Sequence, residues 1–254
     1  MEPILKVENL TKSFSRQGQE TVAAVNGVNL ELFPGECLAI IGESGSGKTT
    51  AVNMIARLLD ATSGSIFLEG QEITHLKGSA LRGIYRTMQV VSRARADSFD
   101  PRRTLGDGIG ESLRNAGFSK KETQERVEAL LEKCGLPREF ASRYPHQVSG
   151  GQCQRAAIAR ALATRPKLLI CDEATSALDV TVQKEIIELL NELRSQQGQS
   201  LSILFICHDI SLVRRFADRV LVMYHGDIVE EGTPDEVICN PKNDYTKRLI
   251  DSVL

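Results

Sequence analysis

The stretch from Gly42 to Thr50 constrains the fold more than any other part of the chain. Its sequence, Gly-Glu-Ser-Gly-Ser-Gly-Lys-Thr-Thr, follows an apolar run at 37–41 and precedes a helix-like stretch at 51–59. Strand, glycine-rich loop and helix in this order are typical of a P-loop, because the glycines let backbone N–H groups face an anion at a helix N-terminus. The pattern predicts a binding site for a nucleoside triphosphate.

Two side chains of this loop have predicted roles in the site. Lys48 would reach the β- and γ-phosphates, and the Thr49 hydroxyl would coordinate Mg²⁺. A plain glycine-rich turn is the alternative, and the match of every fixed position argues against it. The rest of the predicted phosphate cradle is Gly42, Glu43, Ser44, Gly45, Ser46, Gly47 and Thr50.

Composition excludes several classes of function. Lys and Arg total 31 against 33 Asp and Glu, a net charge of −2, which argues against bulk nucleic acid as the main partner. The 6 cysteines form no C-x-x-C pair, so we expect reduced thiols in a reducing compartment. No signal peptide is visible, and no apolar run approaches the ~20 residues that span a bilayer. We therefore expect a cytosolic chain that reaches a membrane through a partner.

Secondary-structure signals divide the chain into an α/β core and a helical insertion. Residues 4–33 read as β-structure with a hairpin turn at Asn26-Gly27, and Phe14 falls in a polar link. Helices dominate from about 105 to 163, whereas strands and helices alternate on either side. We predict one domain over 1–254: residues 1–92 and 164–254 form the core with a β-subdomain, and 93–163 form the inserted helical subdomain and the loop before it.

Acidic residues follow the apolar strand predicted at 167–171. Burial of this strand would place Asp172 and Glu173 at the carboxyl edge of a parallel sheet, which argues against a solvated acidic turn. Asp172 would hold Mg²⁺ through water, and Glu173 would polarise the water that attacks the γ-phosphate. His208 follows its own strand in the same way and could donate a hydrogen bond to that phosphate, although a structural histidine is the alternative.

The order of the motifs resembles that of ATP-binding cassette (ABC) ATPases. The set comprises the P-loop, Ser149-Gly150-Gly151-Gln152, Asp172-Glu173, Ser176-Ala177-Leu178-Asp179 and His208. The resemblance covers essentially the whole chain. It implies a P-loop NTPase core with an N-terminal antiparallel β-subdomain and an inserted helical subdomain. It also implies an ATP-sandwich dimer, in which the P-loop of one subunit and the signature of the other, residues 149–152, enclose each nucleotide.

Individual roles follow from the same resemblance. Phe14 matches the aromatic residue that stacks on adenine, with an ordinary partly exposed side chain as the alternative. Asp179 matches the loop that couples the two nucleotide sites, and His208 matches the γ-phosphate sensor. Ser149 and the N-terminus of its helix would form a second anion cradle, which no single chain could close on its own P-loop.

Two further segments resemble the oligopeptide, dipeptide and nickel importer branch of the family. They are Phe99-Asp100-Pro101-Arg102-Arg103-Thr104 and a C-terminal stretch, Asn240-Pro241 with Tyr245-Thr246-x-x-Leu249, in which Asn243 and Asp244 replace the branch's His-Pro pair. The resemblance implies a peripheral ATPase at the cytoplasmic face of the membrane. Its partners would be a second, related cassette, two permease subunits and an extracytoplasmic substrate-binding protein.

Arg93 occupies the position of the family's Q-loop glutamine, which touches Mg²⁺ and the attacking water. A guanidinium has donors only and cannot ligate a cation, so Arg93 either points elsewhere or contacts phosphate directly. Six arginines and two aspartates between Arg82 and Arg103 make this segment locally basic, which fits a solvated face or a surface for an acidic partner loop.

Three functions are compatible with these patterns. The leading one is the ATPase subunit of an importer for peptides, nickel or a metal chelate, with ATP and Mg²⁺ as ligands. A soluble cassette ATPase without a transport role is disfavoured by the near-neutral charge and the single cassette. A regulatory half of a heterodimeric pair is suggested by Arg93, but Lys48, Glu173 and His208 argue against loss of catalysis.

Overall fold

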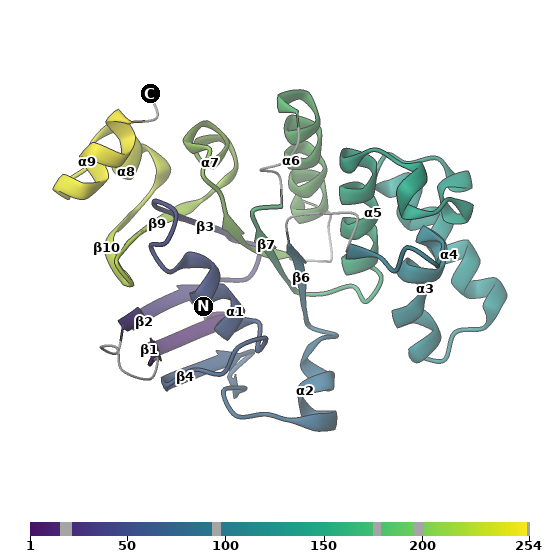
Figure 1. Cartoon of the computed structure of the whole chain (residues 1–254), viewed down its shortest axis with the longest axis horizontal. Helices are drawn as coiled ribbons and strands as arrows, with labels where there is room; N and C mark the ends of the chain where they lie inside the picture. The colour runs from purple at the N-terminus through teal and green to yellow at the C-terminus, as the bar shows by residue number, and fades with distance from the viewer. Residues whose placement is uncertain (16–21, 93–97, 175–178, 196–200, 253–254) are drawn as a thin grey trace.

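The computed structural model describes residues 1–15, 22–92, 98–174, 179–195 and 201–252. Two sheets and a separate group of helices make up these parts of the chain (Figure 1). The fold class is confirmed: an α/β cassette core carries an antiparallel β-subdomain and a helical subdomain.

A six-stranded sheet forms the centre of the molecule. Its strands follow the order β10 (Asp227–Gly232), β9 (Arg219–Tyr224), β3 (Cys37–Ile41), β8 (Ser202–Ile206), β7 (Leu168–Asp172) and β6 (Met88–Ser92). All neighbours are parallel except β9 and β10, which form an antiparallel pair at one edge. Parallel pairing brings the carboxyl ends of β3, β7 and β8 to one edge of the sheet.

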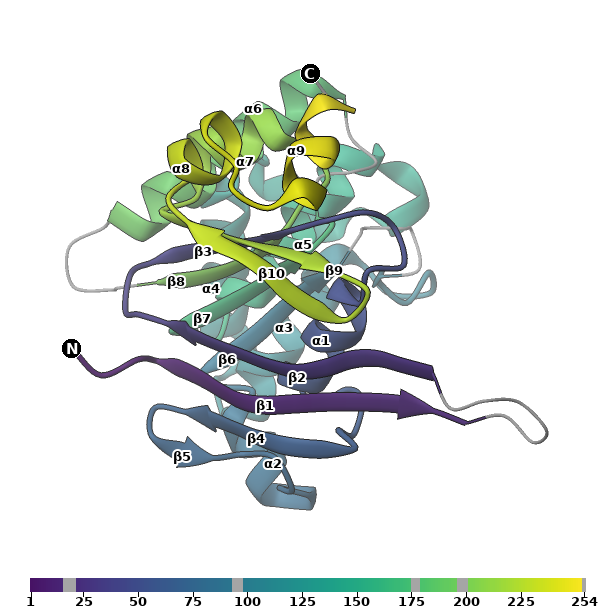
Figure 2. The same cartoon turned by 90° about the vertical axis from the view of Figure 1, so that its left-hand side faces the viewer.

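A four-stranded antiparallel sheet forms the β-subdomain. Its order is β2 (Val22–Leu32), β1 (Leu5–Phe14), β4 (Ser63–Leu68) and β5 (Gln71–Glu72), as Figure 2 shows below the six-stranded sheet. The predicted hairpin at Asn26-Gly27 is wrong, because β2 runs through both residues. Gly27, at φ 62°, lies where the register with β1 shifts between the Leu10–Val28 and Lys12–Val25 pairs. The left-handed glycine therefore makes a bulge instead of a turn.

Phe14 is also placed differently from its prediction. It is the last residue of β1, paired with Val22, and does not belong to the link between strands. The side chain remains 46% exposed, so it can still receive a ligand.

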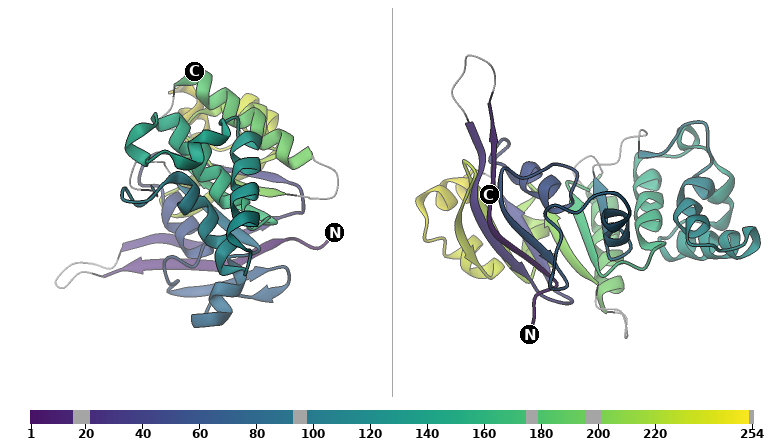
Figure 3. Two further views of the ribbon diagram at one scale, coloured as in Figure 1. Left: turned by 90° about the vertical axis from the view of Figure 1, so that its right-hand side faces the viewer. Right: turned by 90° about the horizontal axis from the view of Figure 1, so that it is seen from below.

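Helices cover the central sheet and build the insertion. They are α1 (Lys48–Ile55), α2 (Gly78–Ile84), α3 (Leu105–Asn115), α4 (Lys120–Lys133), α5 (Gly150–Leu162), α6 (Val180–Ser195), α7 (Ile210–Phe216), α8 (Pro234–Cys239) and α9 (Asp244–Asp251), with short 3₁₀ turns at Arg138–Ser142 and Pro145–Gln147. A capping box of Ser119 and Glu122 starts α4. Figure 3 shows α3 and α4 at the opposite end of the molecule from β1 and β2.

Alternation along the central strands separates two hydrophobic cores. In β3, Ala39 and Ile41 face a core shared with α3 to α9, whereas Leu38 and Ile40 face a core shared with α1 and the β-subdomain. Both faces of the parallel strands are covered, which explains their nearly continuous apolar sequence. Among the described residues, no helix combines the length and apolar character needed to cross a bilayer.

Candidate active site

The register of the central sheet assembles the site. Ile206 of β8 pairs with Asp172 of β7 on one side and with Ile40 of β3 on the other. The residues that follow these three strands are therefore neighbours in space although they are far apart in sequence. This edge holds the P-loop after β3, Glu173 after β7 and His208 after β8.

Lys48 is folded back into the P-loop. Its ammonium group donates to the carbonyl oxygens of Gly42 at 2.8 Å and Glu43 at 2.7 Å, and to Ser46 Oγ at 3.1 Å. These contacts use all three donors of the group. Burial lowers the pKa of Lys48, and the nearby acidic groups, Glu173 first, oppose that shift.

Two glycines of the loop are required by close backbone approach. A Cβ on Gly42, at φ 147°, would lie 2.2 Å from the Met223 carbonyl oxygen, and one on Gly47, at φ 108°, would lie 2.3 Å from that of Ala24. Both positions combine a left-handed backbone with contact against another chain segment. The loop is thus held between β2 and β9.

Thr49 and Asp172 face each other across the loop. The Thr49 hydroxyl donates to Asp172 Oδ1 at 3.4 Å. Burial raises the pKa of Asp172, and the neighbouring charge of Glu173 adds to that rise, while Thr49 and Lys48 oppose it. The chain therefore keeps a carboxyl group where its ionised form is disfavoured.

Glu173 points back towards the end of β8. It adopts φ 50°, a left-handed conformation uncommon for a residue with a side chain, and its N–H donates to the Ile206 carbonyl oxygen. Its Oε1 lies 2.6 Å from His208 Nε2. The strained turn thus brings the two predicted catalytic side chains together beside the P-loop.

A cavity of about 150 Å³ lies over this cluster. Its walls are Ala24, Ser44, Gly45, Gly47, Lys48, Thr49, Thr50, Glu173 and His208. Most of the predicted phosphate cradle is therefore adjacent to the predicted catalytic residues. Phe14 and the exposed Asp179 do not line the cavity, so their proposed contacts with nucleotide stay predictions.

The signature lies elsewhere, at the start of α5. Ser149 caps this helix through a capping box: its Oγ accepts from the Gln152 N–H at 3.3 Å, and its own N–H donates to Gln152 Oε1 at 2.9 Å. Ser149 and Gly150 are exposed, and Gly151 and Gln152 are half-buried. None of the four lines the P-loop cavity.

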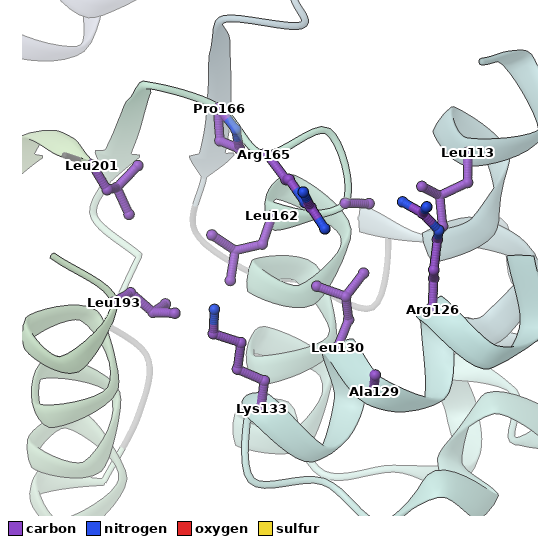
Figure 4. Close-up of a pocket in the computed structure, with 11 residues that line it drawn as sticks. Leu113, Arg126, Ala129, Leu130, Lys133, Leu162, Arg165, Pro166, Leu193 and Leu201 are labelled. Atoms are coloured by element: carbon purple, nitrogen blue, oxygen red, sulfur yellow. The ribbon is translucent and has the colours of Figure 1, made fainter. Parts of the chain in front are cut away.

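Another cavity, of about 230 Å³, lies between α4, the end of α5 and α6 (Figure 4). Its lining combines several leucines with the basic residues Arg126, Lys133 and Arg165. It contains none of the residues predicted to contact nucleotide. The residues predicted to contact nucleotide lie instead around the smaller P-loop cavity.

Some residues around the site were not predicted from sequence. Ala24 lines the cavity, Gly226 N–H donates to the Ser46 carbonyl oxygen at 2.9 Å, and Tyr245 accepts from the Glu43 N–H. These contacts come from a strand, a turn and a helix that are distant in the sequence, and they have no local sequence signal. Arg93 and the 176–178 part of the Ser176–Asp179 motif lie outside the described residues.

The glycine-rich loop, its lysine and the carboxylates at the sheet edge define a P-loop ATPase site. The sequence model of the ABC transporter family matches residues 25–176. The oligopeptide transport ATP-binding protein OppF of Escherichia coli K12 is 44% identical over 244 residues, covering 95% of this chain and 72% of OppF. The glutathione import ATP-binding protein GsiA of Shigella dysenteriae is 45% identical over 259 residues, covering 99% of this chain but only 41% of GsiA.

A solved structure extends the comparison. The dimeric ATP-binding cassette MJ0796, in a post-hydrolysis state bound to ADP and Pi, matches with a TM-score of 0.81 and 31% identity over 91% of this chain and 98% of that one. The chain belongs to the ABC transporter ATP-binding proteins, close to the OppF and GsiA branch. It is a transport-coupled ATPase that binds ATP.

Proposed function

We propose that this chain hydrolyses Mg-ATP at sites shared with a second cassette and thereby powers uptake of a peptide-like cargo through a partner permease. The observation that carries the proposal is the separation of the two predicted halves of the site. Lys48, Glu173 and His208 meet at one cavity, whereas the signature is exposed at the start of α5, apart from it.

The residues at the sheet edge fit a magnesium ion. A threonine hydroxyl and a carboxylate are the hard oxygen donors that Mg²⁺ prefers, and Thr49 and Asp172 bring them within hydrogen-bond distance of each other. Asp172 would act through a bound water, and the ion would supply charge neutralisation at the phosphates. The raised pKa of Asp172 is the electrostatic condition that a cation would relieve.

The chain's own groups account for the remaining chemistry. Lys48 would exchange at least one loop contact for a phosphate oxygen when nucleotide binds. Glu173 would accept a proton from the attacking water as it orients that water towards the γ-phosphate. His208, hydrogen-bonded to Glu173, would hold this carboxylate and meet the γ-phosphate through its ring.

A neighbouring cassette would complete each site. The exposed N-terminus of α5 presents backbone N–H groups and a favourable dipole, a suitable cradle for the γ-phosphate held by another chain. The dimeric arrangement of the similar MJ0796 cassette supports this assembly. In this branch we expect the neighbour to be a related but different cassette.

A groove of about 330 Å³ between β6 and α3 is a suitable seat for a permease loop. Gln89, Phe99, Arg103 and Arg160 contribute to its lining. Arg103 pairs with Glu111 at 2.9 Å, which reduces the net positive charge predicted for this segment. The chain would dock there, at the cytoplasmic face of the membrane, against a permease that works with an extracytoplasmic substrate-binding protein.

The cargo is inferred from the relatives alone. OppF is named for oligopeptide transport and GsiA for glutathione import, so a short peptide is the proposed class of substrate. Membrane complexes purified through this chain and placed in vesicles should take up a labelled oligopeptide or glutathione with ATP. A complex that hydrolyses ATP but transports neither would refute the cargo while leaving the ATPase intact.

A further inference from the structure

The C-terminal helix reaches the first peptide of the P-loop. The Glu43 N–H donates to Tyr245 Oη at 2.9 Å. Tyr245 is the second residue of α9 and is only 5% exposed. This contact joins segments about two hundred residues apart. It also gives a structural reason for the Tyr245-Thr246-x-x-Leu249 pattern, whose three named side chains are all buried.

The bonded N–H belongs to the same peptide group whose carbonyl holds Lys48. The Gly42 carbonyl oxygen accepts from Lys48 Nζ at 2.8 Å, and the Glu43 N–H donates to Tyr245. In a planar trans peptide the C=O and N–H point in opposite directions. Fixing the N–H towards α9 therefore fixes the carbonyl towards the catalytic lysine.

Several interactions fix helix α9, and with it the Tyr245 side chain that contacts Glu43. Asn243 caps it by accepting from the Tyr245 N–H at 2.8 Å, and the Glu230 carboxylate accepts from the backbone N–H groups of Lys242 at 2.8 Å and Asn243 at 3.0 Å. The Tyr245 ring stacks on Tyr224 of β9, with centroids 3.9 Å apart. Figure 2 shows α9 above the β9–β10 edge of the central sheet.

Nucleotide binding would make the hydrogen bond between Tyr245 and the Glu43 N–H necessary for the shape of the loop. All three N–H donors of the Lys48 ammonium group are hydrogen-bonded inside the loop. At least one of these hydrogen bonds must break before Lys48 can donate to a phosphate. If it leaves the Gly42 carbonyl, that peptide loses one of its two anchors. The hydrogen bond from Glu43 to Tyr245 is the anchor that remains.

We propose that Tyr245 is a positioning residue for nucleotide binding: its hydroxyl holds the Gly42–Glu43 peptide so that the P-loop keeps its binding geometry when Lys48 turns to phosphate. The proposal rests on nucleotide binding at the P-loop, as proposed above. It assigns the C-terminal helix a role in the active site.

The test compares two single-atom deletions in the full chain. Tyr245→Phe removes the hydroxyl but keeps the stacked ring, and Tyr224→Phe, the matched control, removes the hydroxyl of the other ring in the stack. Loss of one neutral hydrogen bond predicts about two- to tenfold weaker binding of Mg-ADP for Tyr245→Phe. In the same variant the Glu43 amide should exchange its hydrogen faster, as measured by NMR without nucleotide. Tyr224→Phe should leave both quantities at the wild-type level.

Each outcome of this comparison is decisive. Wild-type nucleotide affinity in Tyr245→Phe overturns the proposal, even if the variant unfolds at a lower temperature, because the hydroxyl then contributes to stability only. Equal weakening in Tyr224→Phe also overturns it, since the effect would then come from the stack. If the wild-type chain itself fails to bind Mg-ADP, the proposed nucleotide site is refuted, while the exchange rate of Glu43 still tests the anchor.

Discussion

The P-loop edge and the start of α5 are both predicted to contact the γ-phosphate, yet they are built differently. At the P-loop edge, segments that follow β3, β7 and β8 lie side by side, Lys48 is buried, and the charges of Glu173 and Asp172 act on its pKa. At the start of α5, a capping box links Ser149 to Gln152, three positions further along the same helix. The arrangement of the P-loop edge therefore depends on tertiary structure, whereas the arrangement at the start of α5 depends on residues of that helix end alone.

The difference concerns where each region finds its partner. The P-loop cavity has acid, base and hydroxyl groups within the same chain. The exposed N-terminus of α5 offers mainly backbone N–H groups that have no partner within the helix. The anion that they would bind must come from another molecule. Substitutions at the two regions should therefore separate binding from turnover.

The largest effect is expected at the P-loop edge. Glu173→Gln should keep ATP binding but lower turnover of the assembled complex by roughly a hundredfold or more, about 3 kcal/mol of barrier, because the amide cannot accept the proton. Steady-state ATPase assays and nucleotide titrations measure the two quantities. Unchanged turnover would remove Glu173 from its proposed role.

At the start of α5, Gly150→Asp should block turnover without harming the fold. A Cβ at Gly150 meets nothing within 4 Å, and a carboxylate in the first turn of a helix is favourable. In the assembled complex the same charge would face a neighbour's γ-phosphate, so we expect at least a tenfold loss of turnover, about 1.4 kcal/mol. ATP binding by the isolated chain should be unaffected.

Gly150→Ala is the matched control, since it fills the same space without the charge. Turnover closer to the wild type in this variant would attribute the loss to electrostatics. Weakened ATP binding by the isolated Gly150→Asp chain would contradict the separation of the two regions.

The grouping of residues at the P-loop edge could be predicted because each of them lies directly after an apolar strand. Parallel strands end at a common edge, so Asp172, Glu173 and His208 could be grouped from the sequence alone. The capping box at Ser119 depends on Glu122 three positions later, so it too has a local sequence signal.

Features that depend on contacts between residues far apart in the sequence could not be predicted from local sequence patterns. Asn26-Gly27 has the local signature of a turn, but pairing of both flanking segments with β1 keeps β2 continuous. The left-handed turn of Glu173 depends on its bond to Ile206 in the neighbouring strand. The contact of Tyr245 with Glu43 requires the whole sheet between them to be in place.

A smaller effect, a loss of folding stability, is expected from Ser149→Ala. The change removes the hydroxyl that accepts from the Gln152 N–H, and loss of such a cap costs about 1 kcal/mol. Thermal unfolding of the isolated chain should detect it, and Ser149→Thr should restore most of the loss. An unchanged unfolding temperature would mean that the capping box contributes nothing to the signature helix.

The smallest effect has the opposite sign and belongs to the P-loop edge. Burial and the charge of Glu173 raise the pKa of Asp172 above its ordinary value of 3.8, so its ionised form destabilises the nucleotide-free chain. Asp172→Asn should therefore be more stable than the wild type at neutral pH and unfold at a higher temperature. The gain in free energy of unfolding should be no more than about 1 kcal/mol, since the site is partly solvated.

The pH dependence of stability checks this cause. The destabilisation by ionised Asp172 is absent where the group is protonated in both the folded and the unfolded state. It appears as pH rises from the unfolded towards the folded pKa of Asp172, and it is complete above the folded pKa. The advantage of the variant should vanish accordingly in acid, and Mg-ATP should reverse it at neutral pH by stabilising the wild type more. A variant that is less stable than the wild type without nucleotide would show that Asp172 is a structural residue, and would remove the contrast with Ser149.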